Sequence, residues 1–269
     1  MSETTKQSPF SKKGPTKYEA NQNSRIRKII GVVSGKGGVG KSTVTSLLAC
    51  ASARAGYHTA ILDADITGPS IPACFGLSGL LYSTEENFIL PAYTAQGIKV
   101  VSTNLIMEDE EAPVIWRASI LNGVIKQFFT ETDWGEVDYM FVDLPPGTSD
   151  IPLTIMQSMP LDGIIIVSTP QGLVRLIVEK AINMARMMNV KIIGLVENMS
   201  YVECDNCGNR TYLFGSSRAE EVCELHNIPL LARLPINPAL STVIDAGRIE
   251  EYPVSYLDEA FAAVEKFGK

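Results

Sequence analysis

The fold of this chain can be predicted from one glycine-rich segment, Gly35-Lys36-Gly37-Gly38-Val39-Gly40-Lys41-Ser42. It fits the pattern G-x-x-x-x-G-K-[ST], and it lies between an apolar run at residues 28–34 and a helical pattern at residues 41–55. This strand–loop–helix setting is the one that a phosphate-binding loop requires. Glycines let successive backbone N–H groups point at one anion, and the helix N-terminus adds the positive end of its dipole.

The side chains of this loop indicate a nucleoside triphosphate with Mg²⁺, for which we take ATP. We expect Lys41 to neutralise charge on the β- and γ-phosphates and the Ser42 hydroxyl to bind Mg²⁺. A glycine-rich turn without a ligand is the alternative, and the complete pattern in its required setting disfavours it. The expected nucleotide ligands of the loop are Gly35, Lys36, Gly37, Gly38, Val39, Gly40, Lys41, Ser42 and Thr43.

Short apolar runs alternate with helical patterns along the rest of the chain. The apolar runs occupy residues 28–34, 59–63, 98–102, 139–144, 163–168, 191–196 and 230–234. The helical patterns occupy residues 41–55, 116–130, 173–188, 216–226, 238–246 and 254–266. Continuous Val, Ile and Leu runs form strands that are covered on both faces, and strand–helix alternation gives right-handed βαβ units. The sequence therefore predicts an α/β fold with a mostly parallel, twisted sheet and helices on both faces.

Composition sets the limits of this domain. The chain has 269 residues, of which 45% are hydrophobic and 20% charged, as in globular proteins. Residues 1–28 hold seven Lys or Arg side chains against two Glu, and the first 24 residues show no apolar periodicity. We therefore expect a flexible polar tail over residues 1–24 and one ATPase domain over residues 25–269.

The same composition disfavours several classes of partner and compartment. No apolar run approaches the roughly 18 residues of a membrane span. The net charge of −7 disfavours a general electrostatic grip on nucleic acid. Five cysteines without an export signal indicate a reducing compartment. We expect a cytoplasmic protein that binds neither membrane nor nucleic acid.

Aspartates follow two of the predicted strands. Asp63-Ala64-Asp65 ends one of them, and Asp143, followed by Pro145-Pro146-Gly147, ends another. The carboxyl ends of parallel strands are where open α/β sheets bind ligands. Carboxylates at this edge hold Mg²⁺, often through water, or orient the attacking water. A capping role is the alternative, and two such strand ends together with the phosphate-binding loop disfavour it. We expect Asp143 in the magnesium shell, and the Gly147 N–H to face the γ-phosphate.

A polar segment, Glu197-Asn198-Met199-Ser200, follows the run at residues 191–196. The amide of Asn198 offers the donor and the acceptor that an adenine edge requires. An asparagine in this setting is equally well explained as a turn former. From the residue alone, both interpretations remain open.

Cys204-Asp205-Asn206-Cys207-Gly208 comes directly after this segment. Two cysteines at this spacing direct both sulfurs to one side of a turn and bind a soft metal or a cluster as thiolates. One pair supplies two ligands of the four that a closed site needs, and a two-fold homodimer would supply the other two. Cys50, Cys74 and Cys223 are more simply small buried hydrophobes. Zinc and a [4Fe–4S] cluster both satisfy four thiolates, and a redox dithiol is a third alternative.

Taken together, these motifs resemble the Mrp/Nbp-type iron–sulfur cluster carrier ATPases, which are deviant P-loop ATPases acting as nucleotide-sandwich dimers. The resemblance covers about residues 28–269. It rests on the loop with its second lysine, on Asp63-Ala64-Asp65 with Gly68-Pro69-Ser70, on Asp143-Leu144-Pro145-Pro146-Gly147-Thr148, on Thr169-Pro170-Gln171, on Val196-Glu197-Asn198-Met199-Ser200 and on the cysteine pair.

The resemblance implies roles for individual residues. Lys36 would reach across a dimer to the partner's phosphates, Asp65 would orient the attacking water, and Asp63 would be an outer-shell magnesium partner. Cys204 and Cys207 would hold a [4Fe–4S] cluster between two subunits, and ATP binding and hydrolysis would control its transfer to apo-proteins. The middle residues of the pair depart from the family, which more often has a proline there.

Two rival functions share parts of this pattern. A zinc-stabilised dimeric nucleotide switch would use the same cysteines. A positioning ATPase would use the same loop, but it needs a basic amphipathic helix or a basic face, whereas the last 20 residues are acidic.

Overall fold

The computed structural model describes residues 17–66, 68–106, 118–148, 150–171, 174–204, 206–215, 217–253 and 255–268. Within them, the strands are β1 (Arg25–Ser34), β2 (Thr59–Asp63), β3 (Ala92–Tyr93), β4 (Lys99–Val101), β5 (Glu136–Asp143), β6 (Gly163–Ser168), β7 (Ile192–Glu203), β8 (Arg210–Thr211) and β9 (Leu230–Pro235). The α-helices are α1 (Lys41–Arg54), α2 (Ile71–Cys74), α3 (Ala118–Thr130), α4 (Asp150–Ser158), α5 (Val174–Met187), α6 (Ala219–His226), α7 (Pro238–Asp245) and α8 (Asp258–Lys266). Short 3₁₀ helices span Thr103–Leu105, Ile249–Glu251 and Ser255–Leu257.

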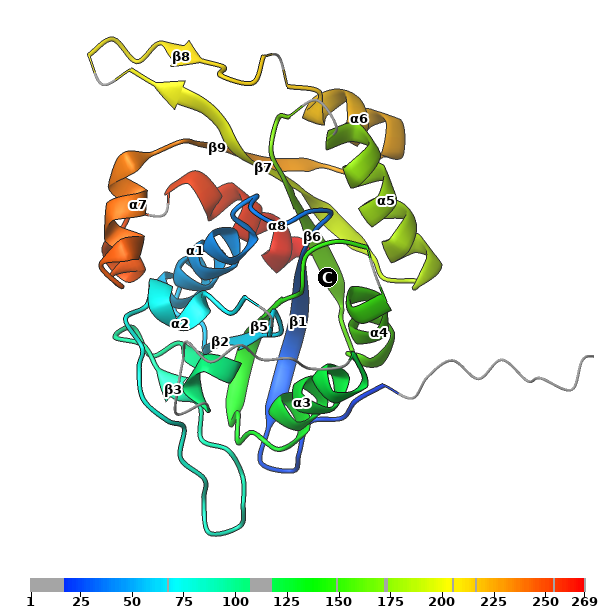
Figure 1. The fold of residues 1–269 in the computed structure, drawn as a ribbon, viewed down its shortest axis with the longest axis vertical. Coiled ribbons are helices and arrows are strands. Elements are labelled where there is room, and N and C mark those ends of the chain that lie inside the picture. The colour runs from blue at the N-terminus through cyan, green and yellow to red at the C-terminus, as the bar shows by residue number, and fades with distance from the viewer. Residues whose placement is uncertain are drawn as a thin grey trace, which may run out of the picture.

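One twisted sheet runs through the molecule, in the strand order β3-β4-β2-β5-β1-β6-β7-β8, with β9 also paired to β7 (Figure 1). The pairs among β4, β2, β5, β1, β6, β7 and β9 are all parallel. Only the short strands β3 and β8 pair antiparallel among the described residues. The predicted mostly parallel α/β sheet is therefore confirmed.

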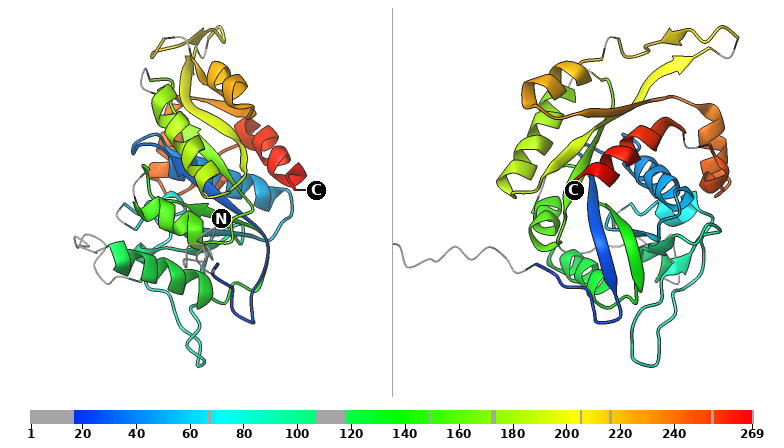
Figure 2. Two further views of the ribbon diagram at one scale, coloured as in Figure 1. Left: turned by 90° about the vertical axis from the view of Figure 1, so that its right-hand side faces the viewer. Right: turned by 180° about the vertical axis from the view of Figure 1, so that it is seen from behind.

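Two hydrophobic cores cover the two faces of the sheet. Residues of α3, α4, α5 and α6 pack on one face, and residues of α1, α2 and α8 pack on the other (Figure 2). Strand β1 shows how the sequence feeds both cores: Ile29 and Val33 join the first, whereas Ile30 and Val32 join the second. Successive side chains of a strand point to opposite faces, so a continuous apolar run requires cover on both sides.

The N-terminal boundary of the domain lies earlier than the sequence indicated. Lys17 donates through Nζ to the carbonyl oxygens of Met156 (3.0 Å) and Met159 (2.8 Å), and the Tyr18 N–H donates to the Ser158 carbonyl (2.7 Å). Residues 17–24 therefore pack on the domain, and the expectation of a flexible tail is wrong for them. Residues 1–16 of the expected tail lie outside the described residues.

Two further elements differ from the prediction. Helix α4 was missed because Pro152 interrupts its pattern, although proline is tolerated in a first helical turn. Strand β7 continues seven residues past the expected end at Val196. Its pairing with β9 shifts register between Glu197 and Tyr201, where Met199 has φ 55°. This β-bulge carries the strand through the polar segment that was expected to leave the sheet.

Among the described residues, no helix combines the length and apolar character that crossing a membrane requires.

Candidate functional site

The glycine-rich loop lies at the carboxyl end of β1 and leads directly into α1. Gly38 and Gly40 have φ values of 75° and 77°, in the left-handed region that glycine tolerates at no steric cost. The loop borders a cavity of about 260 Å³. The lining residues are Ser34, Gly37, Gly38, Val39, Gly40, Lys41, Ser42, Thr43, Asp65, Gly68, Ser70 and Pro146. The structure thus brings most of the expected phosphate ligands and Asp65 to one place.

A fully buried carboxylate, Asp143, organises the base of this loop. Its Oδ2 lies 2.6 Å from Lys41 Nζ and accepts a hydrogen bond from Ser42 Oγ, also at 2.6 Å. Its Oδ1 accepts from Thr45 Oγ1 at 2.7 Å. A buried charge is tolerated when a partner charge and several hydrogen bonds surround it, as here. Thr45 was missed by sequence reasoning, although its position four residues after Lys41 places it on the same face of α1.

A second carboxylate approaches Lys41 from β2. Asp65 Oδ2 lies 3.4 Å from Lys41 Nζ, and the Asp65 side chain lies at the edge of the cavity. The expected role of Asp65, to orient the attacking water, remains a prediction. The lysine is held between two carboxylates, so an incoming phosphate must compete with both of them.

Asp63 is fully buried one strand away from Asp143, and the two residues are register partners in β2 and β5. Its carboxyl oxygens accept hydrogen bonds from Ser102 Oγ (3.0 Å) and the Asp65 N–H (3.2 Å). Burial, together with the charge of Asp143, raises the pKa of Asp63 to about 8. The hydrogen bond from the Asp65 N–H links Asp63 to the segment that carries Asp65, and the expected role of Asp63 as an outer-shell magnesium partner remains a prediction.

Gly147 differs from its expected role. Its N–H donates to the Ser34 carbonyl at 2.8 Å, with a φ of 94° at the glycine. The N–H was expected to face a γ-phosphate, and this arrangement directs it to the backbone of β1 instead. Pro146, one residue earlier, is the part of this turn that borders the cavity.

Lys36 lies at the exposed rim of the loop. Its ammonium donates to Oε1 of Gln171, which follows the end of β6, and so Lys36 has a partner within its own chain. The expected reach of Lys36 to a second subunit remains a prediction.

Asn198 lies beneath the loop. Its side chain is only 6% exposed, and Nδ2 donates to the Val39 carbonyl at 2.9 Å. A Cβ atom at Gly40 would lie 2.1 Å from this nitrogen, so a larger residue there would have to displace the Asn198 amide. The structure therefore places the Asn198 amide against the loop backbone, where it fixes β7 to the phosphate-binding loop. For the expected contact with an adenine edge, the Asn198 amide would have to point away from the loop backbone.

A buried carboxylate that sequence reasoning missed lies next to Asn198. Glu197 is 1% exposed, accepts hydrogen bonds from Ser200 Oγ and Ser217 Oγ, and lies 3.4 Å from Arg233 Nε. These contacts tie the β7 bulge to β9 and to the segment before α6. In the sequence, the only sign of this buried carboxylate is that Glu197 directly follows the apolar run at residues 191–196.

The cysteine pair occupies the tip of a β-ribbon. Strand β7 pairs antiparallel with β8, with Glu203 opposite Arg210. Cys204 closes the turn through two backbone hydrogen bonds: its N–H donates to the Asn209 carbonyl (2.9 Å), and its carbonyl accepts from the Gly208 N–H (2.8 Å). Both Cys204 and Cys207 are exposed thiols. The ribbon extends from the sheet at the end where β7 finishes (Figure 1).

Side-chain contacts stiffen the ribbon. Arg210 Nε lies 3.2 Å from Glu203 Oε2, and the Arg210 guanidinium lies 4.4 Å from the centre of the Tyr201 ring. The Tyr201 and Tyr212 rings are 6.1 Å apart. Cation–π and ring contacts of this kind hold the two strands of the ribbon in one orientation.

The other three cysteines are buried, as expected. Burial raises the pKa of the Cys50 thiol to about 12 and those of Cys74 and Cys223 to about 11. Metal binding requires the thiolate form, so these residues are poor ligands. In the described part of the chain, no group of three or more His, Cys, Asp or Glu side chains forms a metal site.

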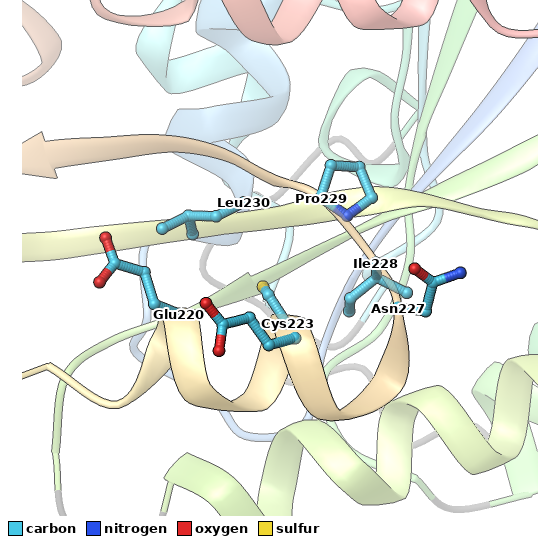
Figure 3. Close-up of a pocket in the computed structure, with 7 residues that line it drawn as sticks. Glu220, Cys223, Asn227, Ile228, Pro229 and Leu230 are labelled. Atoms are coloured by element: carbon cyan, nitrogen blue, oxygen red, sulfur yellow. The ribbon is translucent and has the colours of Figure 1, made fainter.

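A cavity of about 480 Å³, larger than the one at the glycine-rich loop, lies beside Cys223 between α6 and the start of β9 (Figure 3). It is lined by Glu220, Cys223, Glu224, Asn227, Ile228, Pro229 and Leu230. None of these residues lines the cavity at the glycine-rich loop. Volume alone therefore does not identify the functional site.

The parallel sheet, the loop after its first strand and the buried lysine–aspartate contact define a P-loop NTPase. A family model described as ParA, NUBPL iron-transfer P-loop NTPase, matches residues 25–266. The chain belongs to this NUBPL iron-transfer P-loop NTPase family.

Relatives and solved structures agree with this assignment. The chain is 47% identical to an iron–sulfur cluster carrier protein of Clostridium perfringens over 245 residues, covering 88% of this chain and 86% of that protein. It is 43% identical to a cytosolic Fe–S cluster assembly factor NUBP1 homolog of Caenorhabditis briggsae, covering 88% and 79%.

A nucleotide-binding protein of Archaeoglobus fulgidus in complex with ADP has a TM-score of 0.77 and 44% identity, covering 91% of this chain and 93% of that one. The cell division ATPase MinD of Pyrococcus furiosus has a TM-score of 0.65 at 21% identity, covering 89% and 98%, and so it shares the fold alone.

Proposed function

We propose that this protein is an ATPase that holds a [4Fe–4S] cluster between two copies of the chain and transfers it to apo-proteins. The observation that carries the proposal is the continuity of β7. This one strand contacts the phosphate-binding loop through Asn198 and ends five residues later at Glu203, directly before the exposed Cys204.

The number of thiols supports a shared cluster. A [4Fe–4S] cluster takes four thiolate ligands. Cys204 and Cys207 are the exposed pair, and the remaining cysteines are buried with raised pKa values. Two copies related by a two-fold axis would present four exposed thiols to one cluster. A ribbon tip is accessible to such a partner.

The polar groups of the loop support ATP with Mg²⁺. Ser42 Oγ and the Asp143 carboxylate meet at 2.6 Å and supply the hydroxyl and carboxylate oxygens that Mg²⁺ prefers. Mg²⁺ bound there would neutralise charge on the phosphates. Lys41 would exchange a carboxylate partner for phosphate oxygens, and Asp65 would then be released to orient the attacking water. Lys36 would serve the site of the second copy.

The proposed setting is the cytoplasm, where exposed thiols stay reduced. One of the relatives carries the word cytosolic in its name. Apo forms of iron–sulfur proteins would be the partners.

Anaerobic reconstitution with iron and sulfide tests the proposal. We expect four irons per two chains and broad visible absorption from thiolate-to-iron charge transfer. Cys204→Ser and Cys207→Ser should each lose the cluster, because two thiolates per dimer cannot close the site. Cys223→Ser is the matched control, and it should keep the iron content and colour of the unaltered protein.

A zinc-stabilised nucleotide switch is the second candidate, because the same exposed pair would bind zinc. Zn²⁺ has a filled d shell and no redox chemistry, so it gives no such colour. One zinc per dimer, no colour after reconstitution and no iron passed to an apo-ferredoxin would replace the carrier function with the switch.

A further inference from the structure

A cavity of about 420 Å³ lies beside the cysteine ribbon, separate from the nucleotide cavity. Cys204 itself lines it, together with Glu203 and Gly208 of the ribbon. The opposite wall comes from Ile236, Pro238 and Tyr256, around the start of α7 and the turn before α8. Figure 1 shows α7 and the ribbon at the same side of the molecule.

The backbone of β7 presents an open edge to this cavity. Both backbone groups of Cys204 bond within the turn toward β8, to Asn209 and Gly208. Neighbouring residues of a strand direct their N–H and C=O groups to opposite edges. The N–H and C=O of Glu203 therefore face away from β8, on the same edge as the Tyr201 carbonyl.

Strand β9 occupies that edge only up to its own end. The Tyr201 carbonyl accepts from the Ile236 N–H at 2.7 Å, directly after β9 ends at Pro235. The chain then turns into α7 at Pro238. The next position along the edge, at Glu203, opens onto the cavity. A strand edge that opens onto a cavity lined by Ile236, Pro238 and Tyr256, beside the polar Asn237, is a setting in which an extended segment can add a strand.

We infer that this edge and cavity dock an extended, cysteine-containing segment of the protein that accepts the cluster. The inference rests on the proposed carrier function and adds the surface on which transfer takes place. The open edge at Glu203 is one residue from Cys204, which also lines the cavity. A segment docked on this edge would lie next to the bound cluster, and we therefore assign the surface to the acceptor protein.

A docked cysteine would exchange ligands at one iron. The acceptor sulfur forms a bond to that iron, and the bond between the iron and Cys204 Sγ breaks. The proton of the acceptor thiol moves to Cys204 Sγ. No electron is gained or lost, so the step needs no oxidant or reductant. Cys204 lines the cavity and Cys207 is not among its lining residues, so a cysteine docked there would displace Cys204 first.

A proline substitution tests the edge directly. Glu203→Pro removes the N–H that faces the cavity and leaves the bonds toward β8 in place, as proline does at a strand edge. Glu203→Ala is the matched control, since it loses the same carboxylate and its exposed ion pair with Arg210 but keeps the N–H. With apo-ferredoxin as acceptor, the proline variant should transfer its cluster about tenfold more slowly than the alanine variant.

Two isoleucine variants test the wall of the cavity opposite the ribbon. Ile236→Gln places an amide in the cavity and should slow transfer, whereas Ile228→Gln makes the same change at the other end of β9, in the cavity of Figure 3. Equal transfer rates for Glu203→Pro and Glu203→Ala, together with equal rates for the two isoleucine variants, would overturn the docking surface.

Hydrogen exchange of the cluster-free chain separates this inference from the carrier proposal. Adding apo-ferredoxin should slow exchange at residues 201–204. No protection would overturn the docking site even if the cluster is carried and transferred. Protection that increases with the concentration of the chain alone, without ferredoxin, would instead assign the edge to a contact between two copies and also overturn the inference.

Discussion

Lys41 holds the centre of the nucleotide site, between Asp143 at 2.6 Å and Asp65 at 3.4 Å. The two carboxylates differ in environment. Asp143 is fully buried and takes hydrogen bonds from Ser42 and Thr45, whereas Asp65 lies at the edge of the cavity. In the proposed nucleotide site, Asp143 would hold the loop and Mg²⁺, and Asp65 would orient the attacking water.

These two environments predict different variant kinetics. Lys41→Ala should weaken ATP binding and reduce hydrolysis by roughly 10²-fold or more, because it removes the fixed charge opposite the phosphates. Asp65→Ala should still bind nucleotide but lose hydrolysis, because water positioning belongs to the transition state. Fluorescent-nucleotide titration and phosphate release measure the two effects. Equal loss of binding in both variants would assign Asp65 to the magnesium shell.

Asp63 makes stability depend on pH. In the unfolded chain this carboxyl has an ordinary pKa of 3.8, whereas burial and the charge of Asp143 raise its pKa in the folded protein to about 8. Between these values the folded state binds more protons, so the contribution of Asp63 to the free energy of unfolding falls as the pH rises.

Asp63→Asn should remove this contribution, because the amide stays neutral and its oxygen still accepts from Ser102. The difference in unfolding free energy, variant minus unaltered protein, should therefore increase from pH 5 to pH 8. Urea unfolding at both pH values measures it. A difference that is constant or decreases with pH would show that Asp63 is already ionised in the folded protein.

At the scale of elements, β7 connects the two sites. Asn198 donates a hydrogen bond to the loop, and Glu197 accepts one from Ser200 within the β7 bulge. The strand then continues to the cysteine ribbon. The Asn198 amide approaches Gly40 so closely that a Cβ atom there would displace it from its contact with the loop.

Gly40→Ala should therefore destabilise the protein by at least about 2 kcal/mol, from the clash with Asn198 and from the positive φ. Gly37→Ala is the matched control, since a Cβ there meets nothing within 4 Å and its φ lies outside the left-handed region. Thermal unfolding without nucleotide should show a lower midpoint for Gly40→Ala alone. Equal midpoints would contradict the close contact between loop and strand.

The sequence predicted those features of the structure that depend on a local pattern of residues. The loop, the parallel strands and the cysteine pair were predictable, because each depends on a local pattern with a fixed physical requirement. The continuation of β7 was not, because the φ of Met199 and the register shift depend on pairing with β9. The Glu197 contacts and the partner of the Gly147 N–H also depend on tertiary structure. Pro152 hid α4 because proline at a first turn looks locally like a helix break.

At the scale of the whole molecule, both proposed sites require a second copy. Mixing Lys36→Ala chains with Asp65→Ala chains tests this for the nucleotide site. In a mixed dimer, the Lys36→Ala chain keeps its own Asp65 and receives Lys36 from its partner, so ATPase activity should partly return. Heterodimers that form without any return of activity would confine Lys36 to its own chain, in line with its contact to Gln171.

Native mass spectrometry of the anaerobically reconstituted protein measures subunit number and cluster content on the same particle, and so tests whether two copies share one cluster. We expect a dimer that carries one [4Fe–4S] cluster, and no cluster-bearing particle for Cys204→Ser. A cluster on a single chain, or a dimer that carries zinc in place of iron and sulfide, would contradict it.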